Sequence, residues 1–192
     1  MTIDITNCLK INITDSCAVS NIISSRLLFA RASGNNFIFS ITEYVQYECL
    51  YKSRTNPTPK EEELRQRLIK HQQNSKFTVH NLSISDLQDD LLSQHSRQLG
   101  MGEISSVAFA KKIGQPFLTD DQKARKIAQE IMGTRNVQTT PQIVGWLFFN
   151  GSLTDGDLPE LIKEHNEFKR PLEKYFRSVY EEAMRLRLIG AS

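Results

Sequence analysis

The sequence predicts an α/β domain in which a mostly parallel central sheet is sandwiched by helices. Short apolar runs of strand length alternate along the chain with longer segments of helical periodicity. This alternation is typical of parallel sheets whose strands are joined by helical crossovers. The length of 192 residues fits one such domain with an appended helix, and 39% hydrophobic residues allow a packed core.

The strands are predicted from short apolar stretches, at residues 9–14, 37–41, 77–82 and 116–119. The first alternates apolar and polar residues and runs directly into Asp15. The last is very short and ends at Asp120 and Asp121. Because the carboxyl ends of parallel strands share one edge of the sheet, acidic residues at two strand ends are expected at the same edge.

Helices are predicted from apolar periodicity, turn residues and caps, over residues 19–32, 42–51, 61–73, 85–98, 103–113 and 122–132. Glycine and asparagine at residues 34–36 end the first of them. The charged pattern of residues 61–73 indicates a solvated helix, and Ser85 is a suitable cap for the fourth. The small residues of 103–113 favour a closely packed helix that begins at Glu103.

The carboxy-terminal part, residues 166–192, is predicted to be a helical extension of a domain that spans residues 1–165. It carries one apolar stripe, formed by Leu172, Tyr175, Phe176, Val179, Tyr180 and Ala183. The stripe favours packing on the same domain. The alternative is that it docks a partner or a second copy of the chain, which would make a homodimer.

Charge and cysteine content exclude several classes of protein. A formal net charge of +2 excludes a histone-like basic binder, so any contact with nucleic acid must come from local clustering. Three cysteines without CxxC spacing argue against a disulfide framework or a zinc knuckle and favour a reducing compartment. The amino terminus lacks the apolar run of a signal peptide, and no stretch reaches the ~20 apolar residues of a membrane span. These features predict a soluble cytoplasmic protein.

Carboxylates occur at four places where strands end or helices begin: Asp15, Glu48, Glu103 and the pair Asp120–Asp121. Taken singly, each is more simply a helix cap or a first-turn acid. Together they are expected to converge on one edge of the sheet, where they would repel one another unless a divalent cation were present. Hard oxygen ligands of this kind suit Mg²⁺ or Mn²⁺.

These residues resemble the pattern of the PIN-domain nucleases. The matching features are Asp15 followed by Ser16, Glu48 on the second helix, the Gly100-Met-Gly-Glu103 helix start and the Thr119-Asp-Asp121 turn. The Gly-x-Gly-Glu helix is similar to that of one branch of the family, which includes toxin-type ribonucleases. The resemblance covers about residues 9–165. Glu43 remains an alternative to Glu48, and Asp120 an alternative to Asp121.

The resemblance implies hydrolysis of phosphodiester bonds, with RNA as the preferred substrate and DNA as a second one. Asp15 would be the central ligand of Mg²⁺ or Mn²⁺, and Glu48, Glu103 and Asp121 would complete the shell. Ser16 and Thr119 would orient ligands or a water. Basic residues near these turns would contact phosphates, above all Arg97, Lys123 and Arg125. No aromatic residues interleave with them in the sequence, so no base-stacking surface is predicted.

Two functional hypotheses of different classes follow. The first is an active ribonuclease, as the toxin of a toxin–antitoxin pair whose partner is an antitoxin protein. The second is a catalytically silent protein of the same fold that works through its carboxy-terminal helix. A metal-dependent phosphatase or phospho-acceptor domain is less consistent with the chain, because neither paired acids at the first strand nor the downstream Lys or Thr signature is found.

Overall fold

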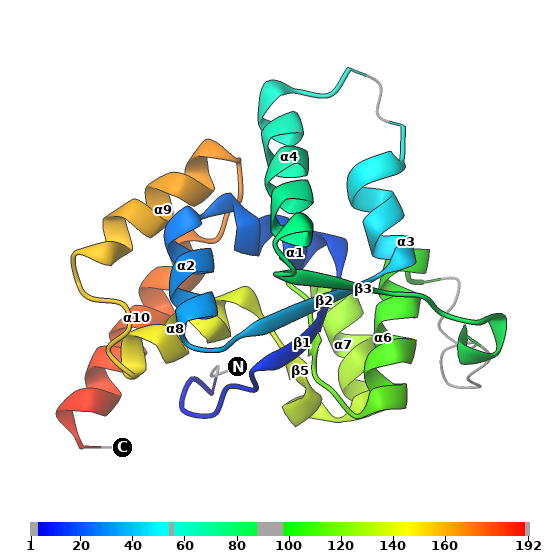
Figure 1. The fold of residues 1–192 in the computed structure, drawn as a ribbon. Helices are drawn as coiled ribbons and strands as arrows, with labels where there is room; N and C mark the ends of the chain where they lie inside the picture. The colour runs from blue at the N-terminus through cyan, green and yellow to red at the C-terminus, as the bar shows by residue number, and fades with distance from the viewer. Residues whose placement is uncertain (1–3, 54–55, 88–97, 191–192) are drawn as a thin grey trace.

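A five-stranded, all-parallel sheet forms the centre of the molecule, as the computed structural model shows for residues 4–53, 56–87 and 98–190 (Figure 1). The order across the sheet is β3-β2-β1-β4-β5. The strands are β1 (Ile11–Thr14), β2 (Ile38–Thr42), β3 (Phe77–His80), β4 (Phe117–Leu118) and β5 (Val137–Gln138). The predicted fold class is therefore confirmed.

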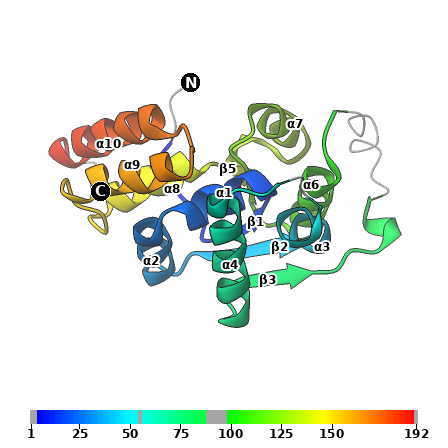
Figure 2. The same cartoon turned by 90° about the horizontal axis from the view of Figure 1, so that it is seen from above.

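Helices cover both faces of this sheet (Figures 1 and 2). In chain order they are α1 (Ser16–Ser24), α2 (Arg26–Gly34), α3 (Glu43–Gln46), η1 (Tyr47–Tyr51), α4 (Pro59–Gln73), η2 (Ile84–Leu87), α6 (Met101–Ile113), α7 (Gln122–Met132), η3 (Thr134–Asn136), α8 (Thr140–Phe149), α9 (Asp157–Glu167) and α10 (Glu173–Leu188). Of these, η1 is a π-helix, and η2 and η3 are 3₁₀-helices.

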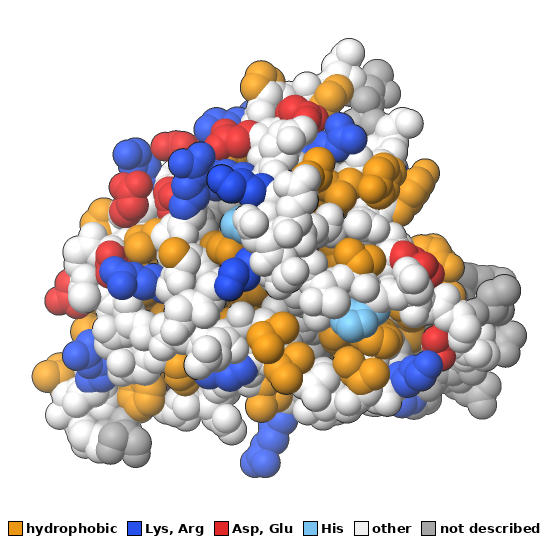
Figure 3. Space-filling view, viewed as in Figure 1, with side chains coloured by type: hydrophobic (Ala, Val, Ile, Leu, Met, Phe, Trp, Pro, Cys, Tyr) orange, Lys and Arg blue, Asp and Glu red, His pale blue; other side chains and the backbone are white. Residues whose placement is uncertain are grey.

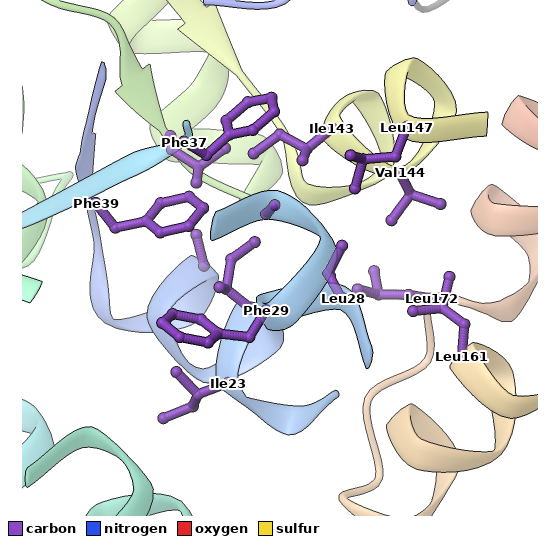
Figure 4. Close-up of a cluster of buried hydrophobic side chains, with 14 of the residues drawn as sticks. Ile23, Leu28, Phe29, Phe37, Phe39, Ile143, Val144, Leu147, Leu161 and Leu172 are labelled. Atoms are coloured by element: carbon purple, nitrogen blue, oxygen red, sulfur yellow. The ribbon is translucent and has the colours of Figure 1, made fainter. Parts of the chain in front are cut away.

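Alternating strand residues supply two hydrophobic cores, one on each face. Phe39 and Ile41 of β2 belong to a large core that also receives side chains from α1, α2, α4, α8, α9 and α10. Part of this core, including Phe29 and Phe39, is shown in Figure 4. Ile13 of β1 and Phe117 of β4 point to the other face and pack with α6 and α7. The two-residue period of a strand accounts for this division.

Three predicted helices differ from the structure. The helix expected over residues 19–32 is two helices, because Ser25 ends α1 and caps α2 by accepting the Leu28 N–H at 2.9 Å. The Ser25 hydroxyl also donates to Glu164 of α9 at 2.5 Å, which fixes the break. The helix expected over residues 42–51 changes from α3 to the π-helix η1. That expected over residues 85–98 appears only as η2, and its remainder lies outside the described residues.

The carboxy-terminal stripe packs within its own chain. Phe176, Val179 and Ala183 of α10 are buried, whereas Tyr175 is 43% exposed. Helix α10 lies along α8, and a Cβ placed on Gly145 of α8 would be 2.9 Å from the Val179 Cβ. Only glycine therefore permits this close approach. Among the described residues, none of the helices is both long and apolar enough to pass through a membrane.

Phe176→Ala is expected to lower the free energy of unfolding by about 3–5 kcal/mol, the usual cost of removing a buried phenylalanine ring. Phe176 is fully buried and its ring packs edge-on against His165 at 4.8 Å. Urea denaturation measures the effect, with the exposed Tyr175→Ala as the matched control. Equal stability of the two variants would contradict the packing of α10 on the domain.

Candidate active site

The candidate site lies where the strand order reverses, between β1 and β4. From β1 the sheet extends to β2 and β3 on one side, and from β4 to β5 on the other. Ligands of parallel α/β sheets bind outside the carboxyl ends of the strands at such a point. Asp15 directly follows β1, and Thr119, Asp120 and Asp121 follow β4. The structure thus brings the first and last acids of the predicted set to one edge.

Asp15 is the buried centre of this cluster, with only 1% of its surface exposed. Its Oδ1 accepts the Ala18 N–H at 2.7 Å, so Asp15 caps α1. Its Oδ2 accepts the Thr119 hydroxyl at 2.5 Å. The Thr119 oxygen in turn accepts the Asp121 N–H at 3.1 Å. Thr119 therefore fixes the carboxylate after β1 against the turn after β4, which suits the supporting role expected for it.

Asp120 and Asp121 have different partners. Asp120 accepts hydrogen bonds on both oxygens, from the Asn21 amide at 2.7 Å and from the Thr140 N–H and hydroxyl at 2.8 and 2.5 Å. Asp121 caps α7 through Oδ1, which accepts two amides of the first turn at 2.8 Å each. Its Oδ2 accepts no hydrogen bond from the described residues. Asp120 therefore joins α1 and α8 to the turn, and Asp121 is the better placed of the two to reach a ligand.

Glu48 and Glu103 meet at the start of α6. Glu103 Oε2 accepts the Gly100 N–H at 2.9 Å, and Glu48 Oε1 accepts the Gly102 N–H at 3.2 Å. A Cβ on Gly102 would lie only 2.4 Å from Glu48 Oε2. Glycine at position 102 therefore lets the Glu48 carboxylate lie directly on the α6 backbone. This is a physical reason for the second glycine of the Gly-x-Gly-Glu sequence.

Two hydroxyls tie the end of β2 to the same helix. The Ser105 hydroxyl donates its hydrogen to the Gly102 carbonyl at 2.9 Å. Because that hydrogen is used, the hydrogen bond of 2.7 Å between Ser105 and Thr42 is donated by the Thr42 hydroxyl. Thr42 ends β2 and caps α3 by accepting the Val45 N–H at 3.3 Å. Helix α3 continues into η1, which carries Glu48. π-Helical turns occur frequently at functional sites, and this one carries an acid of the cluster.

The carboxylates of the cluster influence one another's ionisation. Burial raises the pKa of Asp15 to about 7, and the negative charges of Asp120 and Glu103 add to the rise. The pKa of Glu103 is also raised, first by partial burial and then by the charges of Asp121 and Glu48. Like charges at short range disfavour ionisation, and titratable groups perturbed together are typical of functional sites. The five predicted acids therefore form one electrostatic cluster.

Glu43, the alternative to Glu48, is engaged elsewhere. Its Oε1 accepts the N–H of Leu82, in the segment after β3, at 3.2 Å. The negative charge of Glu48 contributes to the rise in the pKa of Glu103, whereas Glu43 is not among the groups that raise it. Glu48 is therefore the better candidate for the site.

The predicted phosphate-binding residues lie in different places. Lys123 is exposed in the first turn of α7, and its charge partly offsets the rise in the pKa of Glu103. Arg125 lines a separate cleft of about 1160 Å³ between the amino-terminal segment, α7 and α10. Arg97 lies outside the described residues. Of the two described residues, Lys123 is the one that lies beside the acids.

A cleft of about 800 Å³ opens beside the cluster, between α1, η1 and α4. Ser16 and Glu48 line it, together with Tyr51 and Arg170, which the sequence did not single out. Cys17 lines it too, but burial and then the charges of nearby acids raise its thiol pKa to about 12. A thiol with so high a pKa is protonated at neutral pH, which makes it a poor nucleophile.

The donor set has the chemistry that a hard divalent cation requires, because carboxylate oxygens are the ligands that Mg²⁺ and Mn²⁺ prefer. Within residues 4–53, 56–87 and 98–190, however, no three His, Cys, Asp or Glu side chains are grouped closely enough to hold one ion. The acids thus lie near one another without forming a closed coordination shell. Backbone amides hold several of them in place. Their chemical type fits a hard divalent cation, whereas their spacing in this structure does not form a ligand shell.

A family model described as a PIN domain matches residues 35–135, just over half of the chain. The matched region includes Glu48, Glu103 and Asp121, whereas Asp15 precedes it and Arg170 follows it. No curated protein and no solved structure matches the chain significantly.

Proposed function

Because the chain belongs to the PIN-domain family, we propose that it is a metal-dependent endoribonuclease whose active site is the acidic cluster. PIN domains are generally nucleases and typically use divalent metals. The observation that carries the proposal is the burial of Asp15 at the reversal point of the sheet, among four further carboxylates. Structural caps alone do not require such a concentration of negative charge.

In this proposal Asp15, Glu48, Glu103 and Asp121 hold Mg²⁺ or Mn²⁺. A bound ion of this kind lowers the pKa of its water and offsets charge that develops on the phosphate. Thr119 orients Asp15 through its hydrogen bond, and Ser16 lines the cleft where it can orient a water. Lys123 supplies positive charge beside the carboxylates, which favours the approach of a polyanion.

The test is incubation of the purified protein with labelled RNA and labelled DNA in Mg²⁺, Mn²⁺ or EDTA. We expect internal cleavage of RNA in either metal, weaker cleavage of DNA, and none in EDTA. Glu103→Gln should lose activity, whereas Glu160→Gln, which removes an exposed carboxylate of α9, should keep it. Cleavage that persists in EDTA, or no cleavage in any metal, would argue against the proposal.

The cellular role proposed with this activity is that of a toxin whose antitoxin is a second protein, acting in the cytoplasm. It is supported by the resemblance of the Gly100–Glu103 helix start to toxin-type ribonucleases. Induced expression in a bacterial host should then arrest growth, and Glu103→Gln should relieve the arrest. Equal growth of cells that express either form at the same level would count against this role.

The alternative of a silent interaction protein depended on the stripe of α10. Phe176, Val179 and Ala183 of that stripe are buried in their own chain. They are therefore not exposed to a partner, and the nuclease is the better supported function.

A further inference from the structure

The cleft beside the acids has a wall from outside the region that the family model matches. Ser16 of α1 and Glu48 of η1 line the cleft together with Arg170, which belongs to the loop between α9 and α10. The family match ends at residue 135. The carboxy-terminal segment thus contributes a cation to the cleft that also contains part of the candidate active site.

Arg170 is held in place by its own loop. The backbone N–H of Arg170 donates to the backbone carbonyl of His165 at 2.9 Å, and the backbone carbonyl of Arg170 accepts the Leu172 N–H at 2.8 Å. Phe168 anchors the loop: it is buried, and the Arg67 guanidinium of α4 stacks over its ring at 4.7 Å. Helix α9, which leads into this loop, is joined to α1 by a hydrogen bond of 3.0 Å between His165 Nε2 and the Asn21 carbonyl. The position of Arg170 is therefore built by contacts with α1 and α4.

Arg170 has no ion-pair partner within the described part of the chain. Arg65 and Arg67 of α4 pair with Glu62 and Glu63, at 3.4 and 2.7 Å. Arg170 forms no such ion pair with a described residue, and its buried Nε has no hydrogen-bond partner there. An unpaired guanidinium in a cleft is well suited to bind a phosphate through two parallel hydrogen bonds.

An exposed tyrosine lies in the same cleft. Tyr51 ends η1, one turn after Glu48, and is 62% exposed. Figure 3 shows hydrophobic side chains gathered over α3 and η1. Exposed aromatic rings next to basic residues are the usual stacking surface for the bases of single-stranded nucleic acid. The fold thus brings together an aromatic and a cationic residue that do not interleave in the sequence.

We propose that the carboxy-terminal segment completes the substrate cleft, with Arg170 binding the phosphodiester backbone of the RNA strand and Tyr51 stacking on one of its bases. This inference rests on the proposed nuclease function, because it assumes that the RNA strand bound in the cleft is the substrate that the acids cleave.

The test measures binding of a fluorescent single-stranded RNA by anisotropy in the Asp15→Asn background, where cleavage does not interfere. Arg170→Ala is expected to raise Kd about tenfold, and the slope of log Kd against log salt should fall by about one. Arg170→Lys should keep the salt slope, since it keeps the charge, but should recover only part of the affinity, because an ammonium group cannot make two parallel hydrogen bonds to a phosphate. Arg177→Ala is the matched control, because Arg177 is exposed on α10 and pairs with Glu173 at 2.8 Å.

Tyr51 is tested in the same assay. Tyr51→Ala should weaken binding about tenfold without changing the salt slope, and Tyr51→Phe should bind like the parent, because stacking needs only the ring. Tyr175→Ala is the control, since Tyr175 is exposed on α10 outside this cleft. In the cleaving protein, Arg170→Ala should raise KM more than it lowers kcat.

The outcomes separate this inference from the proposed function. If Arg170→Ala and Tyr51→Ala bind RNA as the parent does, with the same salt slope and melting temperature, the inference is overturned even if cleavage is observed. If both variants lose affinity as described and no form cleaves RNA, the inference is supported and the proposed catalytic function is not.

Discussion

Asp15→Asn is expected to lower the rate of RNA cleavage by about 10³-fold or more. A metal ion contributes several kcal/mol of transition-state stabilisation, and about 1.4 kcal/mol corresponds to each factor of ten. Asparagine has nearly the same shape and caps helices as well as aspartate, so the hydrogen bond to the Ala18 N–H is preserved. At the second oxygen the amide would donate to the Thr119 hydroxyl instead of accepting from it, so the loss of activity would reflect the lost charge together with this reversed hydrogen bond. The rate is measured with labelled RNA at saturating Mg²⁺ or Mn²⁺.

The same variant is expected to be more stable than the wild type in EDTA at alkaline pH. Burial raises the pKa of Asp15 from 3.8 to about 7, so the folded state holds a proton that the unfolded chain has already released. This contribution to stability is complete below about pH 4 and is lost as the pH rises through about 7. Asparagine does not titrate, so its advantage should grow by a few kcal/mol between pH 5 and pH 8. Urea midpoints at these two pH values measure it, and a constant difference would contradict the burial of a charged Asp15.

Gly102→Ala is expected to lower activity by about 10–100-fold while leaving the fold intact. The new Cβ would lie 2.4 Å from Glu48 Oε2 and 2.7 Å from Glu48 Cδ, so the carboxylate must move. The atoms that clash are at the end of a flexible side chain, and alanine favours a helix over glycine by roughly 1 kcal/mol. The melting temperature should therefore be unchanged or slightly higher. Losses of this size are typical when the support of a metal ligand is removed.

Gly100→Ala provides the matched control. Among the described residues, the atom nearest to a Cβ at Gly100 would be Glu103 Oε2 at 3.8 Å, which is ordinary van der Waals contact. Activity should stay within a few-fold of the wild type. If Gly102→Ala retains full activity as well, the position of the Glu48 carboxylate on α6 has no role in catalysis.

The strand–helix pattern of the sequence was sufficient to predict the parallel sheet and the end of β1 at Asp15. Two features of the helices were not predictable from periodicity. The break at Ser25 depends on a hydrogen bond to Glu164, which is distant in the sequence. The π-helix η1 follows α3 within one continuous apolar pattern, so the sequence shows a single helix there. Tertiary contacts decide such details.

The acids of the candidate site were also predictable, because each lies at the end of a predicted strand or in a predicted helix, as in the pattern of the PIN domains. Their supports were not. Asn21 and Thr140 fix Asp120 only because α1 and α8 meet at the sheet edge. Thr140 follows β5 at the same edge, and that placement was a signal that could have indicated it. Arg170 enters the cleft by a loop that carries no motif, so sequence alone gave no reason to choose it.

The central claim is that the clustered carboxylates bind a divalent cation, and the melting temperature tests it most directly. An ion that binds only the folded state at 100 times its Kd stabilises it by about 2.7 kcal/mol, which is roughly 5–10 °C for a chain of this size. We expect millimolar Mg²⁺ or Mn²⁺ to raise the melting temperature of the wild type at pH 7.5 by several degrees, and that of Asp15→Asn not at all. A wild type whose melting temperature is the same in EDTA and in millimolar metal would contradict the account.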